Sequence, residues 1–455
     1  MKFICPAQVL SEACMNVQRA TSTKSSNLPT IEGILIKAEN DRIMLTGYDL
    51  EMGIITSVEG RVEQTGSIVL NAKILCDILR NTPDDLVSIE CDERLICKIK
   101  SGDSEFSITG FSEADYPELP TVSGGFPIVI NGDILTDMIK KTIFATADNG
   151  AKMVHTGVRF EVTNENIRLV AVDGYKLAIR NEKIDYVGDE KVFIIPKKTL
   201  NEIMKLSGNS EETVSMVVAS RHIMFECGKY VIVSRLLEGE FLSYKSAVPT
   251  TAKTEVKVNT RNLISSIERT SLIITERIKS YVRCIFDNES IRISSTTALG
   301  TANDRILADI QGERVEIGFN NKYLLDALKV CDIDEVTLRL NGATSPIIIV
   351  PEDDGSLIYE RNFLFMVLPV RMNWFMKKIS VHVKQKEHRE IKIDSDFIRL
   401  DSLLKLCNAV MTGGHAKIVI QEGEVKVNGE LCTARGKKIH VGDKVLFDNI
   451  VYEVV

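Results

Sequence analysis

The sequence predicts an α+β fold in which pairs of helices pack on antiparallel sheets. Two repeated patterns and the chain length support this class. A segment of two alternating strands joined at an Asn occurs three times, and so does a segment in which an apolar strand runs into a helix. At 455 residues the chain exceeds one ordinary hydrophobic core, so we expect three or four domains.

The first repeated pattern predicts β-hairpins. Residues 33–52, 157–179 and 281–304 each read as an alternating strand, a turn and a second alternating strand, which is typical of a half-buried hairpin. Self-similarity at one long interval indicates duplication of a whole domain. The interval is 124 residues, and the turn residues are Asn40, Asn164 and Asn288.

The second repeated pattern predicts helices that begin directly after a strand. Asn71 and Asn320 are suited to cap two of these helices, and Pro196 is tolerated at the start of the third. Apolar residues four positions apart give each helix one buried stripe. With an earlier helix in each module, we expect two helices and about eight strands per domain. The strand–helix segments are 68–80, 193–205 and 317–329, and the earlier helices are 7–21, 131–146 and 260–274.

Domain boundaries are indicated by segments rich in turn and linker residues, at 118–127 and 247–255. The chain also continues beyond the third module. We expect domains at 1–122, 127–249 and 253–372, a linker at 373–396 and a small C-terminal domain at 397–455.

The C-terminal domain is also predicted to be α+β. Helices are expected at 398–410 and 414–421, separated by a Gly-Gly break. Asn428-Gly429 is the strongest short signal for a hairpin turn. A second glycine turn lies in the basic segment 435–445, so strands should follow the two helices.

The composition is that of an ordinary soluble protein, with 44% hydrophobic and 26% charged residues. No apolar run is long enough to span a bilayer, and the N-terminus has no signal-peptide core, so we expect a cytoplasmic protein with no membrane contact. Ten cysteines include no CxxC pair. This pattern favours reduced, mostly buried thiols over disulfides or a zinc site.

Catalytic and metal-ligating patterns are missing from the sequence. The six His residues form no cluster with ligand spacing. The acidic runs 90–93 and 351–356 have no nearby His and no glycine-rich phosphate loop, so turn chemistry explains them better. We therefore expect no catalytic residue, no metal and no cofactor.

Basic residues recur on one helix face although the chain is acidic. The net charge is −7, which divides into −10 for residues 1–376 and +3 for the remainder. In each module two cations stand seven residues apart, on one helix face away from the apolar stripe. For a single helix a solvated face explains this; three copies favour an anionic ligand. The pairs are Lys73 and Arg80, Lys198 and Lys205, and Lys322 and Lys329.

Residues 1–372 resemble the beta subunit of bacterial DNA polymerase III, the sliding-clamp family. The resemblance implies three repeated DNA-clamp domains, each with two helices on antiparallel sheets, and two chains joined head to tail in a dimeric ring. Helices would line the hole and sheets would form the outer wall. The match is carried, in order, by MKF, NLPTIEGILI, LTGYDLEM, FSITGFSEADYPELP, AVDGYKLAI, IIPKK, LLEGEFLSY, EIGFNNKYLLDAL and VLPVRM.

The resemblance implies a processivity factor of DNA replication located at the nucleoid. Its partners would be double-stranded DNA, the replicative polymerase and other proteins with clamp-binding peptides, a clamp loader and a second copy of the chain. Phosphate contacts carry no sequence information, so a ring lined by cations could hold DNA and still slide. The residues expected to contact DNA are Lys24, Lys73, Arg80, Lys140, Lys141, Asn149, Lys152, Lys197, Lys198, Lys205, Lys322 and Lys329.

Two further surfaces follow from the resemblance. Ring closure would join domain one of one chain to domain three of the other, through Phe106 and Ile108 facing Leu272 and Ile273. Partner peptides would bind an apolar cleft between domains two and three. The matching cleft residues are Val172, Gly174, Tyr175, Lys176, Leu177, Leu242, Ala247, Met366, Leu368, Pro369, Val370, Arg371 and Met372.

The C-terminal domain resembles the S4 domain, an alpha-L RNA-binding motif, through RLDSLLKL, GGHAK, GEVKVNGE and RGKKIHVGDKV. The resemblance implies RNA bound across the two helices and the hairpin. The prediction is a sliding clamp with an added RNA-binding module; the alternative is an RNA-binding scaffold that retains the ring fold. The expected RNA-binding residues are Lys405, Lys417, Lys426, Asn428, Arg435, Lys437 and Lys438.

Overall fold

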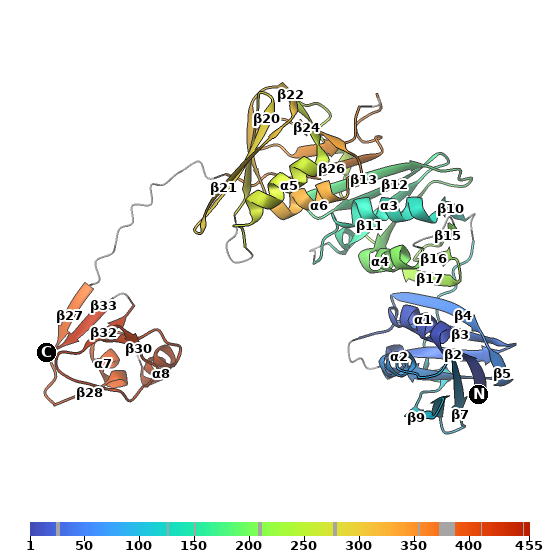
Figure 1. Ribbon diagram of the computed structural model, residues 1–455, viewed down its shortest axis with the longest axis horizontal. Coiled ribbons are helices and arrows are strands. Elements are labelled where there is room, and N and C mark those ends of the chain that lie inside the picture. Colours follow the sequence, from blue (N-terminus) through green and yellow to red (C-terminus); the bar gives the residue numbers. More distant parts are fainter. Residues whose placement is uncertain are drawn as a thin grey trace. The chain divides into compact units, whose positions relative to one another are not determined.

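The computed structural model divides into two compact units, residues 1–372 and 373–455, which are treated separately below (Figure 1). No described helix is long and apolar enough to cross a membrane. The described residues are 1–23, 28–124, 127–149, 152–207, 212–275, 280–353, 355–372, 387–410, 412–448 and 450–455.

The first unit contains the three expected modules, each with two helices. Module one consists of β1 (Lys2–Pro6), α1 (Ala7–Gln18), β2 (Gly33–Glu39), β3 (Arg42–Tyr48), β4 (Met52–Glu59), β5 (Arg61–Gln64), β6 (Gly66–Asn71), α2 (Ala72–Arg80), β7 (Leu86–Cys91), β8 (Ile96–Ser101) and β9 (Ser104–Thr109). Module two consists of β10 (Ile128–Asn131), α3 (Gly132–Ile143), β11 (Gly157–Val162), β12 (Asn166–Val172), β13 (Lys176–Lys183), β14 (Lys191–Pro196), α4 (Lys197–Leu206), β15 (Thr213–Val218), β16 (His222–Cys227) and β17 (Tyr230–Arg235).

Module three repeats this order. It consists of β18 (Thr254–Asn259), α5 (Thr260–Ser271), β19 (Val282–Asp287), β20 (Ser290–Thr297), β21 (Gly300–Leu307), β22 (Asp309–Gly312), β23 (Val315–Phe319), α6 (Asn321–Lys329), β24 (Glu335–Leu340), β25 (Ile347–Val350) and β26 (Phe363–Val367). Its short edge strand β22 pairs with β18 as β5 pairs with β1 in module one. In each module the two helices pack against each other, α1 on α2, α3 on α4 and α5 on α6 (Figure 1).

Local sequence signals explain where these elements begin and turn. Asn71 and Asn320 cap α2 and α6, since their side-chain oxygens accept backbone N–H groups of the first turn, and α4 begins directly after Pro196. The expected hairpins are confirmed as the antiparallel pairs β2–β3, β11–β12 and β19–β20. Asn40 and Asn288 have φ values of 51° and 50°, a left-handed conformation that Asn tolerates well.

The sheets cross the domain boundaries. An eight-stranded sheet has the order β10-β15-β16-β17-β4-β3-β2-β6, so domains one and two join where β17 pairs with β4. A nine-stranded sheet has the order β14-β11-β12-β13-β26-β25-β24-β18-β22, so domains two and three join where β13 pairs with β26. Two sheets remain within single domains: β5-β1-β7-β8-β9 in domain one and β21-β20-β19-β23 in domain three.

The expectation that the cysteines are reduced is wrong for one pair. Cys91 and Cys97 lie directly opposite each other on β7 and β8 and form a disulfide. The pairing of the two strands brings these cysteines together, and a search for CxxC motifs cannot detect such a contact. The other eight cysteines are free, and all of them except Cys407 are buried.

The second unit has its own hydrophobic core and a five-stranded sheet of order β27-β33-β32-β29-β30. Its strand β27 pairs in parallel with β33, so the domain's sheet begins inside the segment 373–396 that the sequence assigns to a linker. Residues 373–386 lie outside the described residues. The elements are β27 (Glu387–Ile391), β28 (Ile398–Arg399), α7 (Leu400–Leu406), α8 (Gly413–Gln421), β29 (Lys426–Val427), β30 (Glu430–Leu431), β31 (Lys438–Ile439), β32 (Lys444–Phe447) and β33 (Ile450–Val454).

The local predictions for this unit hold with one shortening. Helix α7 ends at Leu406 rather than at residue 410, and Asn408, with φ 54°, adopts a left-handed conformation that ends a helix. The Asn-Gly turn is confirmed between β29 and β30, where Asn428 and Gly429 have φ values of 53° and 89°.

Candidate nucleic-acid and partner interfaces

The recurring cations on the helices are exposed, and several have no acidic neighbour. Lys73, Lys140, Lys152 and Lys322 are exposed and form no ion pair with another described residue. The exposed amide of Asn149 lies near Lys152 in the chain. Such side chains can reach a phosphate group without first breaking an internal contact.

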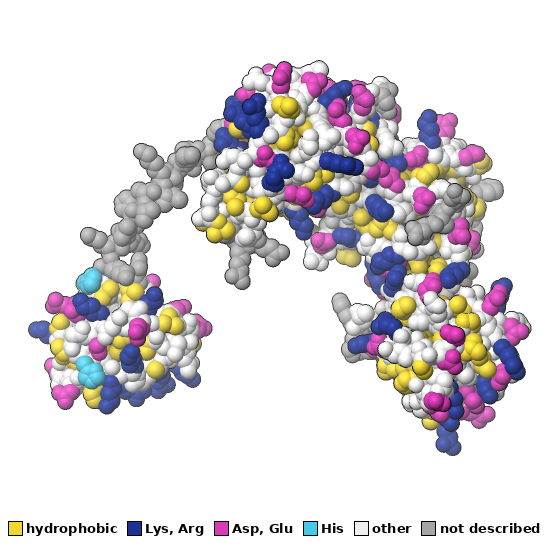
Figure 2. Space-filling model, viewed as in Figure 1, with side chains coloured by type: hydrophobic (Ala, Val, Ile, Leu, Met, Phe, Trp, Pro, Cys, Tyr) yellow, Lys and Arg dark blue, Asp and Glu magenta, His cyan; other side chains and the backbone are white. Residues whose placement is uncertain are grey.

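The other cations expected to contact DNA, apart from Lys24 and Lys141, already pair with carboxylates. Lys197 contacts Asp148, Lys205 contacts Glu202 and Lys329 contacts Glu268, each at 2.7 Å. Arg80 pairs with Asp77 at 3.2 Å, and Lys198 pairs with Asp49. Figure 2 shows this mixing of basic and acidic side chains over the first unit. Exposed pairs contribute only about 0–1 kcal/mol each, so a phosphate can compete for these cations.

Two of the expected DNA-contacting residues do not join this set. Lys141 is buried, and its ammonium lies 2.8 Å from the carboxylates of both Asp137 and Asp332. These contacts neutralise its charge inside the protein, so the structure corrects the sequence expectation and assigns Lys141 a structural position. Lys24 lies outside the described residues.

The predicted peptide cleft coincides with the junction between domains two and three. Val172, Leu177 and Met366 belong to one buried apolar cluster together with Phe241 and Val248. Here Leu177 stands opposite Met366 across the β13–β26 pairing. The other cleft residues surround this cluster at varied depth: Gly174, Tyr175, Leu242, Ala247, Leu368 and Arg371 are exposed, whereas Pro369, Val370 and Met372 are half-buried.

A hollow of about 1050 Å³ adjoins this junction on the side of α6. Its walls include Tyr175 and Tyr323, whose rings stack with centroids 5.7 Å apart, and Asn320 at the start of α6. The backbone N–H of Leu368 donates to the carbonyl of Tyr175 at 2.9 Å and holds the last strand against this wall. Tyr323 lines this hollow, and the sequence reasoning did not single it out although it lies in the repeated segment EIGFNNKYLLDAL.

Lys176 does not line the same face as its neighbour Leu177. Side chains alternate along a strand, so Leu177 faces the apolar cluster while Lys176 faces α3 and α6. Its buried ammonium donates to the carbonyl of Phe144 at 2.8 Å and lies 3.5 Å from the carboxylates of Asp173 and Asp326. Lys176 therefore ties domain two to domain three, and it also lines the hollow beside Tyr175.

The residues expected at the dimer contact lie on or near two free sheet edges. Phe106 and Ile108 are on β9, half-buried against the core of domain one. Leu272 follows α5 and is 81% exposed, and Ile273 is half-buried. Strand β9 ends the five-stranded sheet, and β21 ends the four-stranded sheet.

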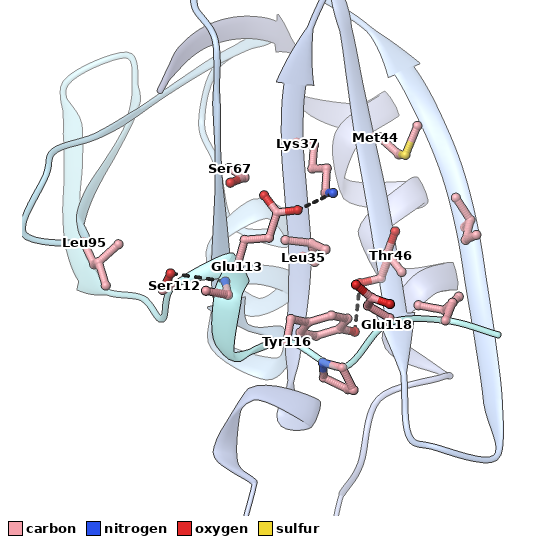
Figure 3. Close-up of a pocket in the computed structure, with 14 residues that line it drawn as sticks. Leu35, Lys37, Met44, Thr46, Ser67, Leu95, Ser112, Glu113, Tyr116 and Glu118 are labelled. Atoms are coloured by element: carbon pink, nitrogen blue, oxygen red, sulfur yellow. Dashed lines mark hydrogen bonds and ion pairs between the residues drawn. The ribbon is translucent and has the colours of Figure 1, made fainter. Parts of the chain in front are cut away.

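A separate hollow of about 800 Å³ lies in domain one under the segment 112–119 (Figure 3). Its polar groups bond to one another: Lys37 pairs with Glu113, and the Tyr116 hydroxyl donates to the carbonyl of Thr46 at 3.2 Å. The hydrogen bond from Lys37 lowers the pKa of Glu113. These internal contacts hold the connecting segment 112–119 on the sheet. No predicted site residue lines the hollow.

The predicted RNA-binding residues of the second unit are all exposed. Asn428 nevertheless has a structural task, since its side chain donates to Asp443 at 2.7 Å and accepts from the backbone N–H of Lys444 at 2.8 Å. These bonds join the two turns of the sheet. Asn428 therefore holds these turns together, and the other six predicted residues supply the positive charge of the candidate set.

A basic patch that the sequence reasoning resolved only in part lies along β28 and β31. We call Phe397, Arg399, Arg435, Lys438 and His440 the β28–β31 patch. Arg399 and Lys438 stand opposite each other in the strand pairing, and Arg399 and Arg435 contact Asp401 at 3.4 and 3.1 Å. Figure 2 shows Lys and Arg side chains gathered on the edge of this unit where β28 lies. Phe397, Arg399 and His440 were missed.

Three duplicated domains with shared sheets, followed by a small helix-and-hairpin domain with a basic patch, define the architecture of a clamp protein with an added C-terminal domain. Sequence models of the DNA polymerase III beta subunit match residues 1–120 (N-terminal domain), 129–242 (central domain) and 245–361 (C-terminal domain), and a model of the S4 domain matches 391–455. Among the described residues, no group of three His, Cys, Asp or Glu side chains is placed to hold a metal ion.

Known relatives agree with this class. The beta sliding clamp of Bacillus subtilis is 33% identical over 383 residues, which is 82% of this chain and 100% of the relative. A crystal structure of the Bacillus subtilis sliding clamp matches with a TM-score of 0.78 and 32% identity, over 82% of this chain and 99% of the other. The crystal structure of a putative DNA polymerase III beta subunit from Eubacterium rectale matches with a TM-score of 0.77 and 33% identity, over 82% and 100%. The chain belongs to the DNA polymerase III beta subunit family, with an S4 domain after the clamp domains.

Proposed function

We propose that two copies of this chain close into a ring around duplex DNA and act as a sliding clamp for the replicative polymerase. One observation carries this proposal. Equivalent pairs of strands form both domain junctions within the chain, and the third copy of each of these two strands lies at the edge of a sheet. β17 pairs with β4, and β26 pairs with β13. β9 and β21, the third copies of these strands, both end their sheets. An edge strand presents unpaired backbone groups to another chain.

The repeated register predicts how β9 and β21 would pair. Strands β4, β13 and β21 begin 124 residues apart, at Met52, Lys176 and Gly300. In the two junctions Met52 opposes Ser234, and Lys176 opposes Val367. The third junction would therefore place Gly300 opposite the residue of β9 that is equivalent to Ser234 and Val367.

Backbone hydrogen bonds identify that residue as Ile108. Three residues after Ser234, Leu237 donates its N–H to Ile194, and three residues after Val367, Val370 donates to Gly318, both at 2.9 Å. In domain one the equivalent bond runs from Phe111 to Val69, also at 2.9 Å, and Ile108 stands three residues before Phe111. Ile108 would then oppose Gly300 of the second copy, with Phe106 opposite Ala302.

Apolar side chains around the two edges support the same contact. Leu272 and Leu299 are 81% and 66% exposed, and Leu299 directly precedes β21. Burying such side chains against Phe106 and Ile108 is favourable by about 25 cal/mol per Å² of apolar surface. Two copies of one heterologous contact close into a ring.

Cations of the helices and their edges are proposed to contact DNA through phosphate groups only. These are Lys73, Arg80, Lys140, Lys152, Lys197, Lys198, Lys205, Lys322 and Lys329, together with the amide of Asn149 and with Lys24 from the undescribed part. Such contacts are independent of base sequence. Five of these nine described cations have a carboxylate partner that weakens their attraction to DNA, which suits a ring held on DNA by its closure.

The junction between domains two and three is proposed to bind the peptides of polymerase and other partners, and a clamp loader is proposed to open the ring. An apolar cluster beside exposed polar and aromatic groups suits a short extended peptide. The S4 domain is proposed to bind RNA through its exposed cations. We propose that the protein works by binding at the nucleoid, without catalysis; turnover of nucleotide with nicked DNA by the purified protein would contradict this.

The decisive experiment is retention on circular DNA. The protein is loaded by a clamp loader with ATP onto a nicked plasmid, separated from free protein, and the plasmid is then cut once. We expect the protein to stay on the circle and to leave after cutting. Rapid loss from both forms would contradict the clamp and favour the alternative, an RNA-binding scaffold that retains the ring fold.

A further inference from the structure

The β28–β31 patch combines cations with an exposed aromatic ring. Ile398 and Ile439 oppose each other and pack inward, Ile439 being fully buried. Since side chains alternate along a strand, the residues on either side of each Ile point outward. Phe397, Arg399, Lys438 and His440 therefore share one solvent-facing surface, and Phe397 as a residue is 37% exposed.

The backbone under this surface is fixed by hydrogen bonds. The N–H of Leu400 donates to the carbonyl of Lys437 at 2.9 Å, and the Ser395 hydroxyl donates to the carbonyl of Phe397 at 2.9 Å. These bonds hold the chain on both sides of β28. An aromatic side chain on such a support loses little further freedom when a ligand stacks on it.

The charge of the surface suits a polyanion. Arg399 and Arg435 share the single carboxylate of Asp401, which is mostly buried, and Lys438 has no carboxylate partner among the described residues. A second carboxylate, that of Asp443, lies 3.8 Å from the His440 ring. Three permanent positive charges therefore face two negative charges, so a phosphate group would meet a net positive surface.

The contact between Lys438 and Phe397 connects the charge to the ring. The Lys438 ammonium lies 4.1 Å from the centroid of the Phe397 ring, and the His440 ring centroid lies at 6.1 Å. A lysine stem is flexible, so the ammonium can move from the ring to a phosphate oxygen and leave the ring face to a base. Combined aromatic and basic side chains are typical of binding to unpaired nucleotides.

We propose that Phe397 stacks on an unpaired base, so that the second unit binds RNA with a single-stranded or bulged nucleotide in preference to a continuous duplex. This inference rests on the RNA-binding function proposed above and specifies its ligand. The argument depends on the ring, its exposure and its cationic neighbours, which together offer a base a flat apolar face beside phosphate-binding groups.

The experiment compares the full chain with Phe397→Ala, Phe397→Tyr and Ile418→Ala. Ile418 is 52% exposed on α8 and controls for loss of apolar surface without a ring. The probes are a twelve-nucleotide single-stranded RNA that carries 2-aminopurine, its blunt duplex and a DNA strand of the same sequence. Base stacking quenches 2-aminopurine fluorescence, a signal that a merely structural role of Phe397 would not produce.

We expect single-stranded RNA to bind more tightly than duplex and to be quenched. Phe397→Ala should weaken its binding by about 5- to 100-fold and abolish the quenching, while Phe397→Tyr and Ile418→Ala retain both. The slope of log affinity against log salt should stay unchanged in Phe397→Ala, because no phosphate contact is removed.

The outcomes separate the two proposals. Equal binding and quenching by wild type and Phe397→Ala would overturn the stacking role and leave RNA binding intact. Binding of the DNA strand alone, lost in Phe397→Ala, would support stacking and overturn the RNA assignment. Absence of binding to all three probes would overturn both.

Discussion

Lys140 and Lys141 are neighbours on α3 whose side chains have opposite surroundings. Lys140 is exposed, whereas only 5% of the Lys141 side chain is accessible. The Lys141 ammonium bridges Asp137 of the same helix and Asp332 of domain three. Sequence position alone suggests the same role for both lysines, but the second has become part of a domain junction.

The two lysines should respond differently to removal. Lys141→Ala should lower the free energy of unfolding by about 1–3 kcal/mol, because it takes a charged donor from the junction. Lys140→Ala should change stability by less than about 0.5 kcal/mol and reduce the slope of log DNA affinity against log salt by roughly 1. Denaturant unfolding and salt titrations of DNA binding measure both effects. A reduced salt slope in Lys141→Ala would show that its ammonium does reach DNA.

Asp443 should make the stability of the S4 domain depend on acid pH. The backbone N–H of His440 and the amide of Asn428 donate to its carboxylate and lower its pKa. A carboxylate whose pKa is lowered in the folded state stabilises the fold at pH values above its unfolded pKa of about 3.9. This stabilisation is lost as the pH falls through the folded-state pKa. Thermal unfolding between pH 6 and pH 3 should show this loss, and Asp443→Asn should not. Asn428→Ala should destabilise the domain by about 1 kcal/mol.

At the scale of elements, the edge strands β9 and β21 differ from their counterparts inside the chain. β17 and β26 are covered by a neighbouring domain, while β9 alternates half-buried and exposed residues along its whole length. A free edge of six residues invites pairing and is usually protected in monomers. Because the register repeats, the proposed pairing predicts which residue of β9 lies opposite each residue of β21 in the second copy.

Cysteine cross-linking can test that register. The pairing places Ser107 opposite Thr301 of the second copy, and both residues are exposed. Ser107→Cys combined with Thr301→Cys should form an intermolecular disulfide, because directly opposed residues have Cα atoms about 5.5 Å apart. Non-reducing electrophoresis detects the product. Ser107→Cys with Asn303→Cys is the matched control, displaced by two residues; efficient cross-linking there instead would disprove the register.

At the scale of the whole molecule, the chain consists of two units with separate hydrophobic cores. Separate cores allow the two units to unfold separately. The first unit contains both edge strands and all the proposed DNA contacts. The second contains all the proposed RNA contacts.

Removal of residues 373–455 should therefore separate the activities. The chain 1–372 should keep the mass of a dimer in sedimentation and its retention on circular DNA, and it should lose RNA binding. The full chain should show two thermal transitions, of which only one remains after truncation. A monomeric product would mean that the S4 domain contributes to ring closure.

Much of the fold follows from local pattern. Alternation, Asn turns, helix caps and the 124-residue interval were enough to identify three equal modules and their helices. Exposure of a candidate site residue was predictable where its position in a repeat decides that exposure, as for Lys73 and Lys322. Prediction failed where contacts between segments distant in the sequence decide the surroundings of a side chain. Cys91 meets Cys97 across a strand pair, Lys141 meets Asp332 of another domain, and Tyr323 meets Tyr175.

The sequence by itself determined the modules, their order and the family to which they belong, because periodicity, capping and turn residues act over a few neighbouring positions. Only the tertiary structure decided which strands join the domains, which edges stay unpaired and which lysines keep a free charge. Those outcomes depend on residues brought together from far apart in the chain, such as Ser234 with Met52 and Lys176 with Asp326. Burial and charge pairing at these contacts decide which side chains remain available to bind a ligand.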